Sequence, residues 1–233
     1  AGGAFNFSDL ATVGIDRVEI VRGSQTALYG SEAISSVIQL FTPRGRGAPS
    51  AFLRFRGGNH GTFEEQLGFS GGTNAYGYHL SFERSDTEGV LKTNSDFSNT
   101  TIASRFDFAP SEKLELTTTL RYNDSRFHHP TGGAGDRFDP LDPNQYLDLR
   151  RLMIGPRVLY EPFTWWRHQL QLGLVNEWRT FRDPEDGFGI DPYGSFVSTA
   201  RERRISADYS SDLFLPSLLG ILPTWTMGFY VED

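Results

Sequence analysis

The chain has 233 residues, a formal net charge of −7, 19 Phe, 9 Tyr, 4 Trp and 25 Gly, and no cysteine. The lack of cysteine excludes disulfides, thiolate metal sites and a cysteine nucleophile, and the acidic balance without a Lys/Arg run argues against nucleic-acid binding. No apolar run reaches the roughly 18 residues of a membrane helix, but a membrane β-barrel is signalled by alternation instead. The sequence starts without Met and stops inside an alternating pattern, so we expect a segment of a longer protein.

The first 47 residues contain two short apolar stretches joined by a glycine-containing connection. VEIV (18–21) predicts a strand, and RG predicts a turn after it. SQTALYGSEAI (24–34) predicts a short helix or turn, in which Gly30 permits a positive φ. SVIQLFT (36–42) predicts a second strand, followed by an extended exit, PRGRGAPS (43–50).

From about Ser50 onward, apolar and polar residues alternate with a period of two in about nine segments. In TFEEQLGFS, for example, Phe63 and Leu67 share one face while Glu64 and Gln66 share the other. Each segment is near the roughly 9–11 residues that a tilted membrane strand needs. A soluble antiparallel sheet with one wet face would alternate in the same way, so the alternation alone leaves both classes open.

The connections between these segments alternate in length. The short ones are expected at Gly71–Asn74, Ala109–Glu112 and Pro162–Thr164. The long ones, rich in Gly, Asp and Pro, are expected at Ser85–Asn99, Phe127–Gln145 and Arg182–Arg201. Short turns at one end and long loops at the other are typical of outer-membrane barrels, as are the aromatic residues beside the turns: Phe163, Trp165, Trp166 and Trp225.

The stretch GIDRVEIVRGSQTALYGSEAISSVIQLFTPRG closely resembles the C-terminal part of the plug domain of TonB-dependent outer-membrane receptors. The positions that match the family pattern are Ile15, Arg17, Val18, Glu19, Ile20, Val21, Arg22, Gly23, Ala27, Leu28, Tyr29, Gly30, Ala33, Val37 and Ile38. The sequence departs from the pattern at Asp16, Ser24, Ser36 and Gln39, and none of these removes an apolar position.

The resemblance implies an all-β chain: residues 1–47 as the C-terminal part of a small α/β plug domain, and residues 48–233 as about nine antiparallel transmembrane strands. The complete barrel of this family usually has about 22 strands around the plug. Nine strands alone would form an open sheet with unpaired backbone groups exposed to lipid, so closure of the barrel needs further strands. The implied function is energised uptake of a ferric siderophore or cobalamin across the bacterial outer membrane. TonB, the implied partner, grips a motif N-terminal to this sequence.

The resemblance also marks candidate site residues. Family plugs carry Arg–Glu contacts, so Arg17, Glu19 and Arg22 are candidates for ion pairs with carboxylates of the barrel wall; otherwise they are solvated strand charges. Candidate substrate contacts in the long loops are Phe127, His128, His129, Phe188 and Tyr193. Oxygen ligands for a loop calcium ion are candidates at Asp136, Asp139, Asp142 and Asn144, although their spacing does not match an EF-hand. No other cofactor is expected.

Enzymatic activity is not expected, because the sequence has no nucleophile elbow, paired-carboxylate signature or phosphate loop. His168 falls on the outward face, but no motif places a serine beside it.

Two alternatives to a TonB-dependent receptor stay open at this point. A passive porin or adhesin-type barrel would lack the plug, and a soluble β-rich binding module would have no lipid-facing stripe.

Overall fold

The computed structural model describes residues 10–23, 36–130, 142–185, 195–216 and 223–233. Within these ranges a two-stranded antiparallel sheet pairs β1 (Arg17–Arg22) with β2 (Ser36–Phe41) and sets Ile20 opposite Ile38. These are the two strands expected in the first 47 residues. In the described part of the chain, no helix is long and apolar enough to cross a membrane.

The second sheet has nine strands, each hydrogen-bonded to its sequence neighbours in the order β11-β10-β9-β8-β7-β6-β5-β4-β3. All of its pairings are antiparallel. The strands are β3 (Gly47–Gly57), β4 (Phe63–Gly72), β5 (Tyr76–Thr87), β6 (Phe97–Ser111), β7 (Leu114–His128), β8 (Tyr146–Phe163), β9 (Trp166–Asp183), β10 (Phe196–Phe214) and β11 (Thr224–Glu232). The predicted antiparallel, nine-stranded portion of a barrel is therefore confirmed, and its sheet is open.

Several strands run further than the sequence indicated. β6 continues through Pro110 to Ser111, and the pairing with β7 shifts register between Phe108 and Ser111. Proline donates no ladder hydrogen bond and is tolerated at such an irregularity, so Pro110 does not end the strand. The short connection is therefore two residues, Glu112 and Lys113, and not Ala109–Glu112.

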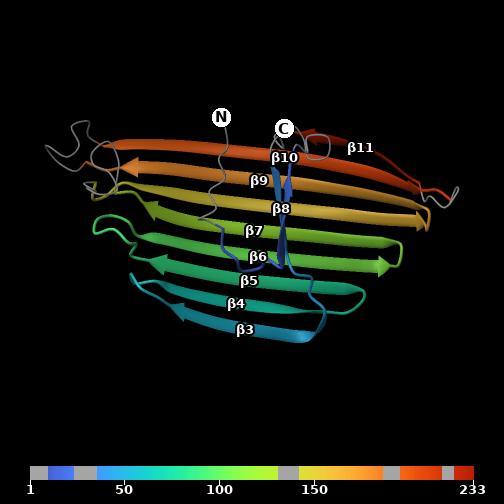
Figure 1. Cartoon of the computed structure of the whole chain (residues 1–233), viewed down its shortest axis with the longest axis horizontal. Helices are drawn as coiled ribbons and strands as arrows, with labels where there is room; N and C mark the ends of the chain where they lie inside the picture. Colours follow the sequence, from blue (N-terminus) through green and yellow to red (C-terminus); the bar gives the residue numbers. More distant parts are fainter. Residues whose placement is uncertain (1–9, 24–35, 131–141, 186–194, 217–222) are drawn as a thin grey trace.

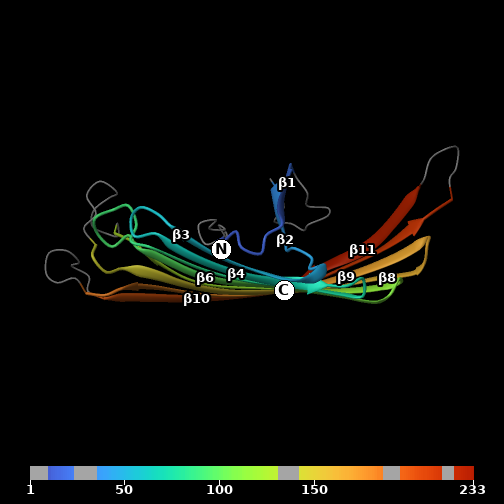
Figure 2. The ribbon, with the colours of Figure 1, turned by 90° about the horizontal axis from the view of Figure 1, so that it is seen from below.

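The nine-stranded sheet, called the wall below, is strongly curved, and the β1–β2 sheet lies on its concave side (Figure 2). Residues 10–23 and 36–46 are called the plug segment. The β5–β6, β7–β8 and β9–β10 connections lie at one end of the wall (Figure 1). The short β4–β5, β6–β7 and β8–β9 turns lie at the other end, together with the longer β10–β11 connection. Because side chains alternate along a strand, residues next to those that contact the plug segment point to the convex face.

Burial in the wall is the reverse of that in a soluble protein. The side chains that are buried are mostly polar and face the concave side, among them Gln66, His79, Ser81, Glu83, Thr101, Asp107, Thr117 and Asn123. Large apolar side chains are exposed on the convex face, among them Leu53, Leu67, Leu80, Ile102, Phe106, Phe108, Met227 and Phe229. A contiguous exposed apolar surface of this kind suits lipid, and a soluble sheet would not present it.

Candidate functional site between the plug segment and the wall

In the middle of the wall, Arg121 binds the backbone of the plug segment. The guanidinium of Arg121, on β7, donates from Nη2 to the backbone oxygen of Ala11 at 2.5 Å and from Nη1 to that of Val13 at 3.3 Å. Ala11 and Val13 are each only 6% exposed. An arginine can serve two acceptors at once because its five N–H groups form a planar fork. The contact therefore fixes the plug backbone without depending on the plug side chains.

Gly14 brings the same part of the plug segment against β5 and β6. Its φ is +69°, in the left-handed region that glycine adopts without a steric penalty. A Cβ atom at this position would lie 2.5 Å from Ser81 Oγ and 2.8 Å from Ala103 Cβ. Both the backbone conformation and the close approach therefore require glycine here.

The concave face behind this contact is a hydrogen-bonded polar layer. Gln66 Nε2 donates to Glu83 Oε2 at 2.7 Å, and both side chains are buried. Asn123 Nδ2 donates to Asn99 Oδ1 and, at 3.3 Å, to Thr101 Oγ1. Buried polar groups must find such partners because leaving them unpaired is costly. The layer thus presents the plug segment with a polar and ordered surface.

A second contact lies at the short-turn end of the wall, around the carboxylate of Asp107. The Asp107 side chain has no exposed surface and pairs with Arg105 at 2.8 Å. Arg105 also donates to the backbone oxygen of Thr42 at 3.0 Å. Arg44, in the exit from the plug segment, lies 3.9 Å from Asp107 and 3.6 Å from Glu115. This ion-pair network, which the sequence did not predict, fastens the chain where it passes from plug to wall.

Gly45 allows the chain to pass this point. A Cβ atom on Gly45 would overlap the backbone oxygen of Tyr78 and would lie 2.6 Å from that of Gly71. Backbone atoms cannot move aside as a flexible side chain does, so the exit segment needs glycine where it crosses the turn between β4 and β5.

The three predicted plug charges lie on β1, away from these contacts. Arg17 Nε pairs with Glu19 Oε1 at 2.6 Å, with side chains 55% and 47% exposed, and the Arg17 guanidinium stacks 3.8 Å from the centre of the Phe41 ring. Arg22 is exposed. Ion pairs of Arg17, Glu19 and Arg22 with wall carboxylates therefore stay a prediction.

At the long-connection end, three of the predicted loop residues, Phe127, His128 and His129, lie in a packed base. His128 Nδ1 is 2.6 Å from Asp96 Oδ2, and the His129 ring meets Phe127 edge to face with centroids 4.3 Å apart. Asn94 Nδ2 joins the two sides of the loop by donating to the backbone oxygens of His129 (3.1 Å) and Gln145 (2.9 Å). Burial lowers the pKa of His129, the neighbouring His128 lowers it further, and Asp142 acts in the opposite direction.

The calcium candidates are only partly within the described residues. Asp142 Oδ1 accepts the backbone N–H groups of Asn144 at 3.0 Å and Gln145 at 2.8 Å, so this carboxylate caps a turn. In the described ranges, no group of three or more His, Cys, Asp or Glu side chains is placed to hold a metal ion. Four predicted residues lie outside the described residues: Asp136, Asp139, Phe188 and Tyr193.

Beside the short turn between β8 and β9, the convex face carries the expected aromatic residues. The rings of Phe163 and Trp165 stack at 5.1 Å. The strand register also places Ser211 opposite His168, a pairing that the sequence did not indicate. His168 Nδ1 lies 2.8 Å from Tyr209 Oη, and Trp166 Nε1 donates to Ser211 Oγ at 2.9 Å. His168 and Ser211 are therefore each bound to an aromatic side chain of this belt.

Solved structures of outer-membrane receptors share this fold. The copper transporter OprC superposes with a TM-score of 0.74 and 12% identity over 94% of this chain and 34% of its own. The ferripyoverdine receptor of the outer membrane of Pseudomonas aeruginosa superposes with a TM-score of 0.71 and 14% identity over 95% of this chain and 32% of its own. No family model matches the chain.

In sequence, the chain is 36% identical to the vitamin B12 transporter BtuB of Photobacterium profundum over 76 residues, which are 33% of this chain and 12% of the transporter. It is 48% identical to BtuB of Vibrio cholerae serotype O1 over 42 residues, 18% of this chain and 7% of that protein. In fold and in part of its sequence, the chain is therefore similar to a segment of TonB-dependent outer-membrane receptors. It spans about a third of the solved chains that it matches, and 12% and 7% of the length of the two transporters.

Proposed function

We propose that the complete receptor takes up a ferric siderophore or cobalamin across the outer membrane, with energy delivered through TonB. The observation that carries this proposal is the plug segment bound to the polar concave face of a wall whose convex face is apolar. A passive porin needs no such obstruction, and a soluble binding module would not place its apolar side chains outward.

The strength of the plug contacts suits a gate. The wall holds the described plug backbone through Arg121 and Arg105, and the exit segment through Arg44. Hydrogen bonds from charged groups contribute roughly 1.5–3 kcal/mol each, and the pairs of Arg44 with Asp107 and Glu115 are long, at 3.9 and 3.6 Å. Contacts of this size keep the plug in place at rest, yet a pulling force can break them one at a time.

The names of several relatives support this class of cargo, although OprC is named a copper transporter. Those similar in sequence are named vitamin B12 transporters, and the structural neighbours include receptors for ferripyoverdine and ferric enterobactin. Vitamin B12 and ferric siderophores are bulky metal chelates, for which aromatic and imidazole side chains at the loop end are suitable contacts. We therefore propose Phe127, His128, His129, Phe188 and Tyr193 as ligand contacts.

Two further sets of residues stay proposals. Arg17, Glu19 and Arg22 are proposed plug–wall pairs, and Asp136, Asp139, Asp142 and Asn144 are proposed calcium ligands.

The test is uptake by whole cells. The complete reading frame that contains this segment is deleted, and the uptake of labelled ferric siderophores and labelled cobalamin is compared in the presence and absence of TonB. Loss of uptake of one substrate, restored by the gene only when TonB is present, supports the proposal and identifies the cargo. Unchanged uptake of every substrate, or restoration without TonB, would favour the passive barrel.

A further inference from the structure

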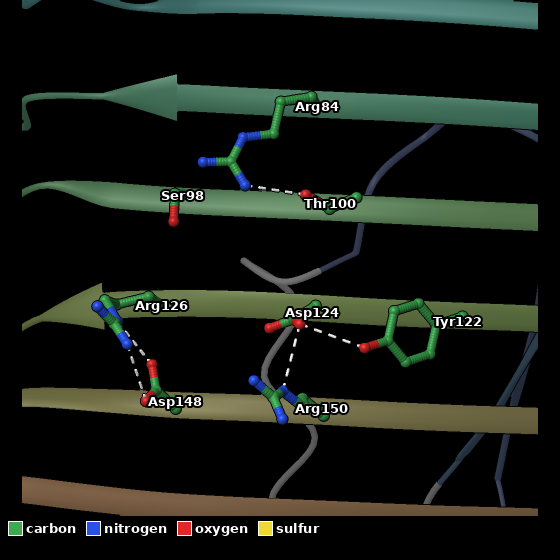
Figure 3. Close-up of a pocket in the computed structure, with 8 residues that line it drawn as sticks. All are labelled: Arg84, Ser98, Thr100, Tyr122, Asp124, Arg126, Asp148 and Arg150. Carbon is green, nitrogen blue, oxygen red and sulfur yellow. Dashed lines mark hydrogen bonds and ion pairs between the residues drawn. The ribbon is translucent and has the colours of Figure 1, made fainter.

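A cluster of charged residues lies on the convex face of the wall, toward the end with the long connections. It surrounds a pocket of about 270 Å³, and its members come from four successive strands, β5 to β8 (Figure 3). The lining residues are Arg84, Ser98, Thr100, Tyr122, Asp124, Arg126, Asp148 and Arg150. The lining contains three arginines and two aspartates, and Asp86, which pairs with Arg84 at 2.5 Å, balances the third arginine.

The strand register arranges the cluster in two rows across the sheet. One row is Arg84, Thr100, Asp124 and Arg150. The next row toward the long connections is Asp86, Ser98, Arg126 and Asp148. The adjacent row on the other side is Phe82, Ile102, Tyr122 and Leu152, which is apolar except for the tyrosine hydroxyl. The change from apolar to polar therefore occurs within one row on all four strands, with charged residues on β5, β7 and β8 and hydroxyl groups on β6.

The cluster faces away from the plug segment, at the depth of the lipid headgroups. Arg121 points to the plug segment on the concave side. Because side chains alternate along β7, Tyr122 and Asp124 both point to the convex side. On β7 the outward apolar stretch begins at Leu114 and ends at Tyr122, a rise of roughly 27 Å along the strand or ~20 Å along the membrane normal after a tilt of ~40°. An outer-membrane barrel has an apolar band ~25 Å tall, so the charged rows lie just beyond it.

The arginines are oriented by carboxylates but still have N–H groups to offer. Arg126 donates from Nε and Nη2 to Asp148 at 2.6 and 3.1 Å, and Arg150 Nε lies 3.2 Å from Asp124. The side chains of Arg126 and Arg150 are 49% and 63% exposed. A guanidinium carries five N–H groups and binds phosphate in a bidentate manner, so each can hold its aspartate and a second anion.

We propose that this cluster binds the phosphate group of an outer-leaflet lipid headgroup. The guanidinium groups of Arg126 and Arg150 are the main ligands, and the hydroxyls of Ser98 and Thr100 are further donors at the same pocket, whereas the Tyr122 hydroxyl donates to Asp124. A lipid phosphate is favoured over a free one because the apolar row directly below the pocket receives the acyl chains of the same molecule. The site is independent of the cargo that the receptor transports.

The experiment uses the complete receptor, purified in detergent and examined by native mass spectrometry. It is mixed with a phosphorylated lipid A-type glycolipid, with the same glycolipid after enzymatic dephosphorylation, or with inorganic phosphate. We expect the phosphorylated glycolipid to remain bound and the dephosphorylated form to bind at least tenfold less, since each charged hydrogen bond lost lowers binding about tenfold or more. Arg126→Gln with Arg150→Gln should produce the same loss with the phosphorylated lipid.

The matched control is Arg56→Gln, which removes an arginine of similar exposure (59%) that also pairs with a carboxylate, Glu64 at 2.8 Å, on the concave face. It should leave lipid binding unchanged. If the double Gln variant fails to fold, as judged by heat-modifiable mobility in electrophoresis, Arg126→Lys with Arg150→Lys replaces it and should lower binding by loss of bidentate contacts. Equal binding of both glycolipids, unchanged binding by a folded double variant, or displacement of the lipid by inorganic phosphate at equal concentration would overturn the proposal.

Discussion

Arg121 of the wall and Ala11 of the plug segment are joined by a hydrogen bond of 2.5 Å that spans 110 positions of the sequence. The acceptor is a backbone oxygen, so any residue at position 11 would offer it. The donor, by contrast, is a specific side chain of the wall. This contact therefore depends on Arg121 and not on the side chain at position 11, so a change of Arg121 should release it.

Arg121→Gln should loosen the plug segment around Ala11 and Val13. The change removes charged hydrogen bonds worth roughly 1.5–3 kcal/mol each, so hydrogen exchange of the amides at positions 11–14 should speed up by at least tenfold. Arg56→Gln, which removes a concave-face arginine paired with Glu64 instead of the plug, should leave this exchange unchanged. Equal exchange in the two variants would show that Arg121 does not hold the plug.

Gly14→Ala should also displace the plug segment, for two separable reasons. The φ of +69° costs an L-residue about 1–2 kcal/mol, and the new Cβ would meet Ser81 and Ala103. Gly23→Ala is the matched control, because Gly23 has a φ of +98° but no atom within 4 Å of its Cβ position. Modification of a cysteine introduced at Ser81 should be faster in Gly14→Ala than in Gly23→Ala. Similar rates would mean that the close approach is unimportant.

Asp107→Asn should lower the free energy of unfolding by about 3 kcal/mol, because it leaves Arg105 without its fully buried partner. Asp86→Asn is the comparison: its pair with Arg84 is exposed on both sides, at 45% and 40%, and is worth about 0–1 kcal/mol. Urea unfolding of the complete receptor in detergent measures both. A smaller loss for Asp107→Asn than for Asp86→Asn would contradict the burial argument.

Phe106→Arg should impair insertion of the barrel. Phe106 is 50% exposed on the convex face and pairs with Thr118, at the centre of the outward apolar stretch of β7. An arginine facing lipid at this depth costs about 2–4 kcal/mol. Thr119→Arg places the same side chain on the concave face of the neighbouring strand and should insert normally. The folded fraction of each variant in lipid vesicles tests this difference, and equal folding would argue against a lipid-facing Phe106.

The loop base around His129 should become less stable in mild acid. Burial lowers the pKa of His129 below its usual value of about 6.5, so the unfolded loop binds a proton more readily than the folded one. Stability is therefore unaffected above about pH 6.5, falls as the pH drops from there to the lowered pKa, and then levels off. Exchange protection of the Gln145 amide should follow this curve, after correction for the intrinsic rate.

His129→Gln should abolish that pH dependence, and His60→Asn, at an exposed turn residue with a φ of 57°, should preserve it. Asparagine tolerates the positive φ, so the control changes only the titrating group. An identical pH profile in His129→Gln would show that His129 is not the titrating group.

The sequence by itself determined the strands and what each face must meet. A strand exposes alternate residues to opposite faces, so the alternation in segments such as KLELTTTLRYND already separates a lipid-facing row from a polar one. The two strands of the plug segment were readable from their apolar residues and the family motif. Strand ends were less readable, because Pro110 breaks a pattern that the irregular pairing of β6 accommodates.

Only the tertiary structure decided which residues hold the plug. Arg105 and Thr42 are 63 positions apart, and their contact depends on the register and curvature of the sheet. A backbone oxygen as acceptor also leaves no trace in the sequence. For the same reason the sequence marked Arg17, Glu19 and Arg22, which the family motif contains, and overlooked Arg44, Arg105 and Arg121. Likewise, Arg84, Arg126 and Arg150 became one cluster only when the register placed four strands side by side.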